Sequence, residues 1–415
     1  MPRRNSTPHS IRRWRGLAMR DLFKIFRSSG PQSQALHFSY EKAGLTVDNQ
    51  PIPWNAEAVI IEANVRLSSA SARNKADFRL RVGGSGLSYS PEVLRQEPGE
   101  PQARLFFRFP VPADSAAIEL TWRDRTLGQI ALPVVRQGDF LRQLGVQTPT
   151  AHVRLGEHTV ACQAFVSGQC QGLTFTAMLT SATNLVPLAD MNLRLEIRRE
   201  DGTPVSTVPV RLTTAQLRSR QAVVAVMPPR PRRSGAWVAD WRLDDDLLAA
   251  LRIRAVSKRH FLRSLRVSAS RFVVQPVRGE PFAMRTLPPL EGIARVGPCF
   301  LLTSGEPGMA GLAQLRVRAR SNDLAPMPVM YERETLVTDG PMPLVAPGLS
   351  TAALSGLKHF AVESAVGVVG ILPLTPIPTA TFTSEGGFRP VEDFTWSSAA
   401  EEQLNERLGR MLGGG

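Results

Sequence analysis

A short phrase that recurs three times limits the fold of this chain more than any other feature of its sequence. The three copies begin at Leu67, Leu179 and Leu302. Each copy ends a hydrophobic run, continues through small polar residues and leads into a run in which apolar and polar residues alternate. The starting points lie 112 and 123 residues apart, which is the length of a domain and far longer than a solenoid unit. We therefore predict three tandem copies of one module.

The apolar residues of these runs alternate with polar ones, which is the period-2 signature of half-buried strands. The first copy has this pattern over residues 61–67 and 78–82, and the second over 173–179 and 191–197. In the third copy, residues 315–320 alternate between apolar and Arg side chains. Strands of about five to eight residues, separated by turns that contain Pro and Gly, are typical of β-sandwiches.

A second stretch recurs in the first two copies only. Trp122 is followed 18 residues later by Phe140, and Trp241 is followed 20 residues later by Phe261. Both phenylalanines open the phrase Phe-Leu-Arg-x-Leu-x-Val. The third copy lacks this ending, so we expect its second half to be divergent.

The pattern resembles tandem immunoglobulin-like or fibronectin-III-like β-sandwich domains at the level of the superfamily, over most of the chain. It lacks the Cys…Trp…Cys core signature, so the resemblance implies a fold and no particular family. We predict an all-β chain of three tandem Ig-like sandwiches, over residues 31–140, 141–262 and 263–395. A basic arm (1–30) precedes them, and a short helix with a glycine tail (396–415) follows. Such sandwiches serve many unrelated functions.

Hydropathy indicates no transmembrane span, because no stretch approaches the roughly 20 apolar residues that a helix needs to cross a bilayer. The most apolar run, 365–374, is expected to form one or two buried strands. The N-terminus lacks the apolar segment of a secretory or twin-arginine signal, which favours the cytoplasm. An organelle transit peptide is the alternative, and Met19 is an alternative start.

The net charge of +14 is concentrated in two segments. Residues 1–29 carry eight basic groups against one acid, and residues 247–279 carry eight basic groups and no acid. The remainder of the chain is close to neutral. Since 45 of the 50 basic residues are Arg, the codon bias of a GC-rich bacterial genome is an alternative source of part of this excess.

The N-terminal arm has apolar residues at helical spacing, with basic residues mostly off that stripe. Such a basic amphipathic helix suits an anionic membrane surface or the groove of a partner. The alternative is an unstructured arm or a helix packed on the first sandwich. The candidate contact residues are Ile11, Trp14, Leu22, Phe23 and Phe26.

The C-terminus predicts a capped amphipathic helix. Ser398 and Glu401 form a capping box, and glycines 413–415 end the helix. We expect the apolar stripe to dock on the last sandwich or on a partner. A terminal Gly-Gly also suits conjugation by enzymes of the ubiquitin type, although nothing upstream resembles a ubiquitin fold. The stripe consists of Leu404, Leu408, Met411 and Leu412.

No catalytic constellation, phosphate-binding loop or metal motif occurs in the sequence, so we predict a non-enzymatic protein without a cofactor. A zinc site at His158, Cys162 and Cys170 would lack a fourth ligand. Two reduced core cysteines are favoured over a disulfide between Cys162 and Cys170, and Cys299 is expected in the core. Three consecutive acidic residues, 244–246, are expected to form a solvated turn.

The basic segment 247–279 holds the best candidate site for an anion or an acidic partner surface, since Arg side chains suit carboxylate and phosphate groups. The alternative is a solvated strand edge whose charges prevent edge-to-edge pairing. Only Phe261 and Phe272 lie nearby, too few aromatic residues to favour single-stranded nucleic acid. The candidate residues are Arg252, Arg254, Lys258, Arg259, Arg263 and Arg266.

These patterns together predict an adaptor or scaffold that binds protein partners through its basic segments and its terminal helix, with an oligomeric state that stays open. The first alternative is a nucleic-acid-associated protein that uses residues 1–29 and 247–279. The second is a substrate for conjugation at the C-terminal glycines.

Overall fold

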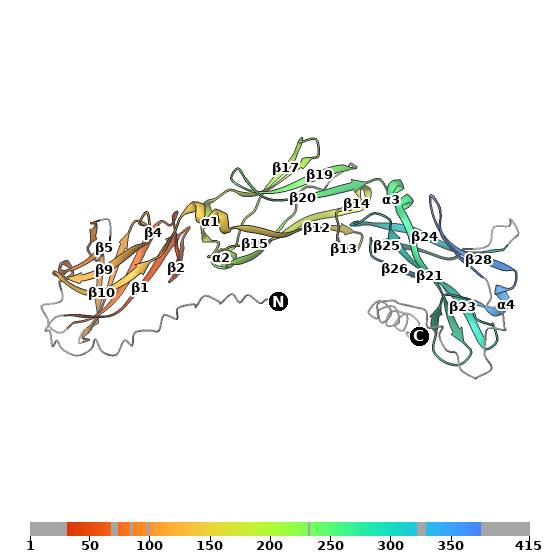
Figure 1. The fold of residues 1–415 in the computed structure, drawn as a ribbon, viewed down its shortest axis with the longest axis horizontal. Coiled ribbons are helices and arrows are strands. Elements are labelled where there is room, and N and C mark those ends of the chain that lie inside the picture. The colour runs from red at the N-terminus through yellow and green to blue at the C-terminus, as the bar shows by residue number, and fades with distance from the viewer. Residues whose placement is uncertain are drawn as a thin grey trace, which may run out of the picture. The chain divides into compact units, whose positions relative to one another are not determined.

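A computed structural model describes residues 31–374, apart from residues 68–73, 84–85, 98–99, 231–232 and 322–328. The chain forms two compact units, Met1–Gln137 and Gly138–Gly415. Strands dominate both units (Figure 1), so the predicted all-β fold is confirmed. The helices among the described residues span no more than seven residues each, and none is long and apolar enough to cross a membrane. They are α1 (Gln137–Gln143), α2 (Thr214–Arg218), α3 (Lys258–Ser264) and α4 (Thr351–Leu354).

Unit 1 is a sandwich of two antiparallel sheets, with strand orders β2-β1-β4-β8-β7 and β10-β9-β5-β6. The predicted alternation holds, because Phe78, Leu80 and Val82 are buried between exposed arginines. A short parallel pair, β3 with β11, completes the unit. Its strands are β1 (Gln32–Lys42), β2 (Leu45–Asp48), β3 (Ile52–Pro53), β4 (Ala58–Arg66), β5 (Phe78–Val82), β6 (Ser88–Tyr89), β7 (Val93–Gln96), β8 (Gln102–Phe109), β9 (Ala116–Trp122), β10 (Arg125–Leu132) and β11 (Val134–Val135).

Unit 2 begins with a second sandwich, in which the sheet β13-β12-β15-β18 faces the strands β17-β16-β19-β20. Trp237 and Trp241 are buried on β19, and the predicted acidic turn at Asp244 connects β19 to β20. The strands are β12 (Gly145–Leu155), β13 (His158–Ala161), β14 (Ala164–Val166), β15 (Cys170–Thr180), β16 (Leu193–Arg199), β17 (Pro204–Pro209), β18 (Gln221–Val226), β19 (Gly235–Leu243) and β20 (Asp246–Val256).

The third sandwich places the sheet β22-β21-β23-β26, extended by β27, against β24, β25, β28 and β29. Its core joins Phe272 and Phe300 from one sheet to Leu315 and Phe360 from the other. The strands are β21 (Leu265–Pro276), β22 (Phe282–Met284), β23 (Ile293–Ser304), β24 (Met309–Ser321), β25 (Val329–Val337), β26 (Met342–Val345), β27 (Leu349–Ser350), β28 (Leu357–Ser364) and β29 (Gly367–Pro373).

Apart from the additional strands β7 in the first sandwich and β27 in the third, the three sandwiches share one strand order. The strands that end near Leu67, Leu179 and Leu302 each pair with the first strand of their sandwich, so the recurring phrase occupies equivalent places. The last antiparallel strand of each sandwich, β10, β20 or β29, also carries a β-bulge against the strand before it. The extra residues are Leu127, Leu248 and Val369, and each is 121 residues from the next. The third copy therefore diverges in sequence while it keeps the strand order of the others.

The second recurring stretch has a different place from the one expected. Phe140 lies on α1 and Phe261 on α3, and each of these helices precedes the first strand of the next sandwich. The phrase is thus a junction helix and not the end of a module, which is why the third copy lacks it. A helix of two turns is too short to show the 3.6-residue period in a sequence. The predicted limits at 140/141 and 262/263 both fall inside these helices.

Strand β14 joins the second sandwich to the third. It pairs in parallel with β20 and with β24, so one nine-stranded sheet runs across the junction. The backbone N–H groups of Gln163 and Ala164 both donate to the carbonyl of Gly308, at 2.8 and 2.9 Å. The side-chain amide of Gln169 both donates to and accepts from the backbone of Leu312, at 2.7 and 2.8 Å. This amide therefore satisfies backbone groups beyond the end of β14.

The most apolar run of the sequence, 365–374, was expected to form one or two buried strands, and this prediction is wrong. It falls on β29, which pairs only with β28 among the described strands and is an edge strand. Val368 and Ile371 are 53% and 52% exposed, whereas Leu372 is buried. Strand β29 packs closely against β21 of the facing sheet, and Gly370 makes this possible. A Cβ on Gly370 would lie 2.3 Å from Cγ2 of Val267 on β21.

Candidate functional site: the basic surface of helix α3

Helix α3 has a capped N-terminus and one buried apolar face. The Ser257 hydroxyl accepts a hydrogen bond from the backbone N–H of His260 at 3.2 Å, which caps the first turn. Phe261 and Leu262 are buried. Lys258 and the other charged residues of the helix are exposed. The helix thus presents basic side chains on a well-anchored backbone.

Helix α3 packs closely against strands β14 and β24, and this contact holds it in place. Phe261 is fully buried in the core of the junction. A Cβ on Gly311 of β24 would lie 2.8 Å from two ring atoms of Phe261 and 2.8 Å from Cγ2 of Val166 on β14. Only glycine leaves room for this packing, because normal carbon contacts begin near 3.5 Å. The position of α3 is therefore coupled to the sheet that crosses the junction.

The carboxylate of Glu306 contacts both α3 and β20. Glu306, on the turn between β23 and β24, accepts a hydrogen bond from the Arg254 guanidinium through one oxygen. Its other oxygen lies 2.5 Å from Nε2 of His260. Glu306 therefore neutralises Arg254 and ties β20 to α3 through one acidic side chain.

Beside Glu306 lies a pocket of about 200 Å³, which we call the α3 pocket. Arg266 donates from Nη1 to the backbone carbonyls of Arg263 and Leu265, at 2.8 Å each. These bonds fix one end of its guanidinium, and the other nitrogens bond to no described residue. The lining residues are His260, Arg263, Ser264, Arg266, Gly305 and Glu306.

The structure divides the six predicted site residues into three groups. Arg263 and Arg266 line the α3 pocket, whereas Arg254 is neutralised by Glu306. The others are exposed, on α3 or on β20, and form no ion pair with a described residue. We call the exposed cations of α3 and its C-terminal flank the α3 surface: Lys258, Arg259, Arg263 and Arg266.

Glu306 and Gly305 were missed by sequence reasoning. They lie about 40 residues beyond α3 and carry no motif. The antiparallel pairing of β21 with β23 brings them to the helix, because Leu265 lies opposite Ser304. No signal in a single sequence could have linked them to the arginines.

Helix α1 shows what the same element looks like without the basic residues. It has the same length as α3, and Phe140 is fully buried as Phe261 is. Arg142, the equivalent of Arg263, pairs with Asp139 on the same helix. The four positions that correspond to Lys258, Arg259, His260 and Arg266 are Gln137, Gly138, Asp139 and Gly145.

The four positions of the α3 surface carry a formal charge of +4, while the same positions of α1, with Asp139, sum to zero. The junction helix therefore forms without a basic surface. The chemistry of the α3 surface is the binding of anions, because guanidinium groups match carboxylate and phosphate oxygens.

The cysteines offer no reactive thiol on this surface. Cys162, Cys170 and Cys299 are free and buried, as the sequence predicted. Burial raises the pKa of the Cys162 thiol to about 12 and that of Cys299 to about 11, and it also raises the pKa of Cys170. These thiols are therefore protonated at neutral pH. Over the described ranges, no three His, Cys, Asp or Glu side chains are grouped as metal ligands.

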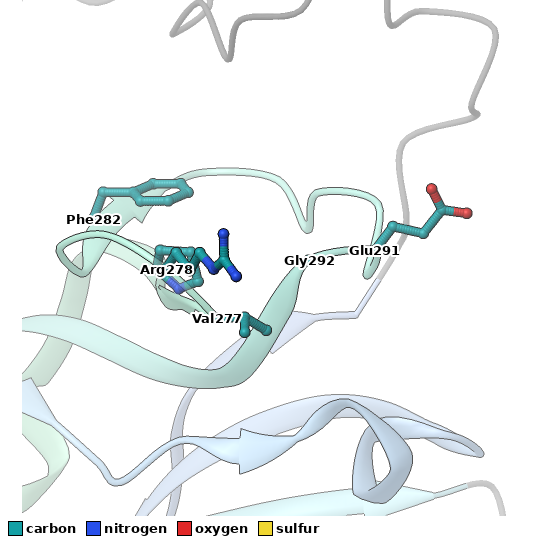
Figure 2. Close-up of a pocket in the computed structure, with 6 residues that line it drawn as sticks. Val277, Arg278, Phe282, Glu291 and Gly292 are labelled. Atoms are coloured by element: carbon teal, nitrogen blue, oxygen red, sulfur yellow. The ribbon is translucent and has the colours of Figure 1, made fainter.

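A second, larger pocket of about 540 Å³ lies on the third sandwich, and we call it the distal pocket. Figure 2 shows the Phe282 ring and the Arg278 side chain over the same loop, whereas Glu291 points away from them. Its lining residues are Pro276, Val277, Arg278, Phe282, Glu291 and Gly292.

Two groups of predicted residues lie outside the described part of the chain. They are Ile11, Trp14, Leu22, Phe23 and Phe26 of the N-terminal arm, and Leu404, Leu408, Met411 and Leu412 of the C-terminal stripe.

No protein-family model matches the sequence, and no curated protein matches it. Among solved structures, the chain is similar to domains 6–7 of the surface layer protein SbsC, with 9% identity and a TM-score of 0.25 over 55% of this chain and 100% of that one. It is also similar to invasin, a bacterial integrin-binding protein, with 10% identity and a TM-score of 0.23 over 83% and 61% of the two chains.

A third similar structure is the Bacteroides ovatus mixed-linkage glucan utilization protein SGBP-B, with 10% identity and a TM-score of 0.15 over 85% of this chain and 97% of that one. TM-scores and identities this low carry no conclusion about the function of this chain.

Proposed function

We propose that this protein is a non-enzymatic scaffold that binds partner proteins, and that the α3 surface is its docking site for an acidic partner. In this proposal the three sandwiches, with the predicted limits 31–140, 141–262 and 263–395, carry binding sites and space them apart. The scaffold acts in the cytoplasm, where buried thiols such as those of Cys162 and Cys299 stay reduced.

The observation that carries the proposal is the comparison of α3 with α1. Both helices bury their phenylalanine and precede the first strand of a sandwich, so the fold needs the apolar face alone. Helix α1 forms without three of the four cations of the α3 surface, since it keeps only Arg142 at these positions. Four like charges on one small surface repel one another, which costs stability that a bound anion would recover.

An acidic protein surface suits these residues better than a nucleic acid. The two aromatic residues near α3, Phe261 and Phe272, are both buried and offer no ring for stacking on bases. A partner with separate carboxylates can pair with Arg263 and Arg266 without any aromatic contact.

The test compares two full-length variants with the wild-type chain. The first replaces the four cations of the α3 surface with Gln, which keeps good helix propensity: Lys258→Gln, Arg259→Gln, Arg263→Gln and Arg266→Gln. The control removes four exposed cations of unit 2 that form no ion pair with a described residue: Arg154→Gln, Arg211→Gln, Arg220→Gln and Arg333→Gln. Both variants lose the same charge.

Each protein is used to capture partners from a lysate of the native host, followed by mass spectrometry. We expect the wild type and the control to retain the same acidic protein at low salt, and the α3 variant to lose it. Equal capture by all three proteins would refute the α3 docking site. Retention of duplex DNA or RNA at about 50 mM salt by the wild type, but not by the α3 variant, would instead favour the nucleic-acid alternative.

A further inference from the structure

The distal pocket exists because one loop of the third sandwich is longer than its counterparts. The first strand of each sandwich pairs with the short strand that follows it. The connections span residues 43–44 in the first sandwich and 156–157 in the second. In the third, residues 277–281 connect β21 to β22, and they contribute Val277 and Arg278 to the pocket. The pocket is thus an addition to a fold that forms without it.

The lining of this pocket is mainly apolar and open to solvent. Val277 is 68% exposed, and the neighbouring Leu290 is 38% exposed. The ring of Phe282 is half-buried, and Arg278 stands beside it (Figure 2). A volume of about 540 Å³ has room for several aliphatic side chains. Exposed apolar side chains around a hollow indicate a binding surface.

The described chain ends at the same end of the sandwich as this pocket. Strand β21 runs away from the junction, since Leu265 lies opposite Ser304 and Pro276 lies opposite Ile293. Strand β24 starts at the junction and ends at Ser321, which lies opposite Leu357 at the start of β28.

The end of β29 returns to the start of β28, because the Leu374 N–H donates to the carbonyl of Lys358 at 2.8 Å. The distal loops and Leu374 therefore share the end that faces away from the junction.

We propose that the C-terminal segment, residues 396–415, docks its apolar stripe in the distal pocket of its own chain. The stripe consists of Leu404, Leu408, Met411 and Leu412. It matches the apolar lining, and Glu402 and Glu406, which lie two residues before and two residues after Leu404, are complementary to Arg278 in the lining. This proposal is independent of the α3 surface.

The length of the intervening chain permits this docking. Twenty-nine residues lie between Leu374 and Leu404, and a chain of that length spans up to roughly 100 Å when extended. A tethered segment also meets its site at an effective concentration of about the millimolar range, so weak binding is sufficient to keep the pocket occupied.

The experiment is hydrogen exchange with mass spectrometry on the full-length protein. The disrupting variant carries Leu404→Asp and Leu408→Asp, and a charge-matched control carries Gln403→Asp and Asn405→Asp. We expect amide exchange over residues 276–292 to rise at least fivefold in the disrupting variant and to stay unchanged in the control. Reciprocally, Val277→Asp is expected to raise exchange over residues 400–412 at least fivefold.

Equal exchange over both segments in all of these proteins would overturn the proposal. Protection that weakens on dilution would also overturn it, because the occupant would then be the segment of a second copy. Neither readout involves capture of a partner by α3, so failure here leaves the proposed function standing.

Discussion

Replacement of Gly311 by Ala tests how tightly the junction between the second and third sandwiches is packed. The added Cβ would lie 2.8 Å from Cε1 and Cζ of Phe261 and 2.8 Å from Cγ2 of Val166. Each of these distances is about 0.7 Å or more short of an ordinary carbon contact. The Phe261 ring is fully buried and cannot swing into solvent, so the helix or the strand must shift.

Overpacking of this kind costs about 1–3 kcal/mol. We therefore expect amide exchange of the protected groups in residues 254–266 to rise roughly 5- to 150-fold, because the equilibrium constant for local opening changes by that factor. The matched control is Gly168→Ala, since a Cβ at Gly168 meets no atom within 4 Å. Hydrogen exchange of both full-length variants measures the difference. An effect of Gly311→Ala no larger than that of Gly168→Ala would refute the packing account.

Three further predictions concern unit 2. Gln169→Ala leaves the backbone groups of Leu312 without their side-chain partner and should lower the free energy of unfolding by about 1–3 kcal/mol, measured by urea denaturation. Gly370→Ala places a Cβ 2.3 Å from Val267 and should also cost about 1–3 kcal/mol in the same assay; no change would mean that β29 is loosely held. Burial raises the pKa of Cys299 to about 11, so the folded state keeps a proton that the unfolded state loses above about pH 9. Stability should therefore fall by up to about 1.4 kcal/mol per pH unit between about pH 9 and about pH 11, and less steeply in Cys299→Ala.

Alternation was enough to predict the strands but not their neighbours. The arginine-spaced runs 78–82 and 315–320 lie on β5 and β24, where the period-2 pattern indicated strands. A strand that is buried on one face leaves this mark in every residue. Strand β14 has three buried residues and no alternation, so its pairing with two sandwiches left no trace in the sequence.

The run 365–374 shows the opposite limit, because hydropathy alone cannot distinguish a central strand from an edge strand. Residues such as Val368 are exposed because β29 has no neighbour on one side among the described strands. The equal spacing of Leu127, Leu248 and Val369 was also hidden, since a bulge has no sequence signature of its own.

The candidate site was predictable only in its charges. The density of basic residues around Lys258 was visible in the sequence, but the helix that carries them was not predicted. The helix that carries them is two turns long, and the carboxylate of Glu306 arrives through strand pairing. The comparison with α1 also needed the structure, because only the fold shows that Phe140 and Phe261 hold equivalent places.

The central claim is that the α3 surface was added to a junction helix in order to bind an acidic partner. Its most direct test is the dissociation constant of the captured partner for the wild type and for the variant with Gln at the four α3 positions, measured at about 50 and 200 mM salt. We predict that the variant binds at least tenfold more weakly at low salt, and that the difference shrinks at high salt because exposed charges are screened. Equal dissociation constants at both salt concentrations would contradict the account.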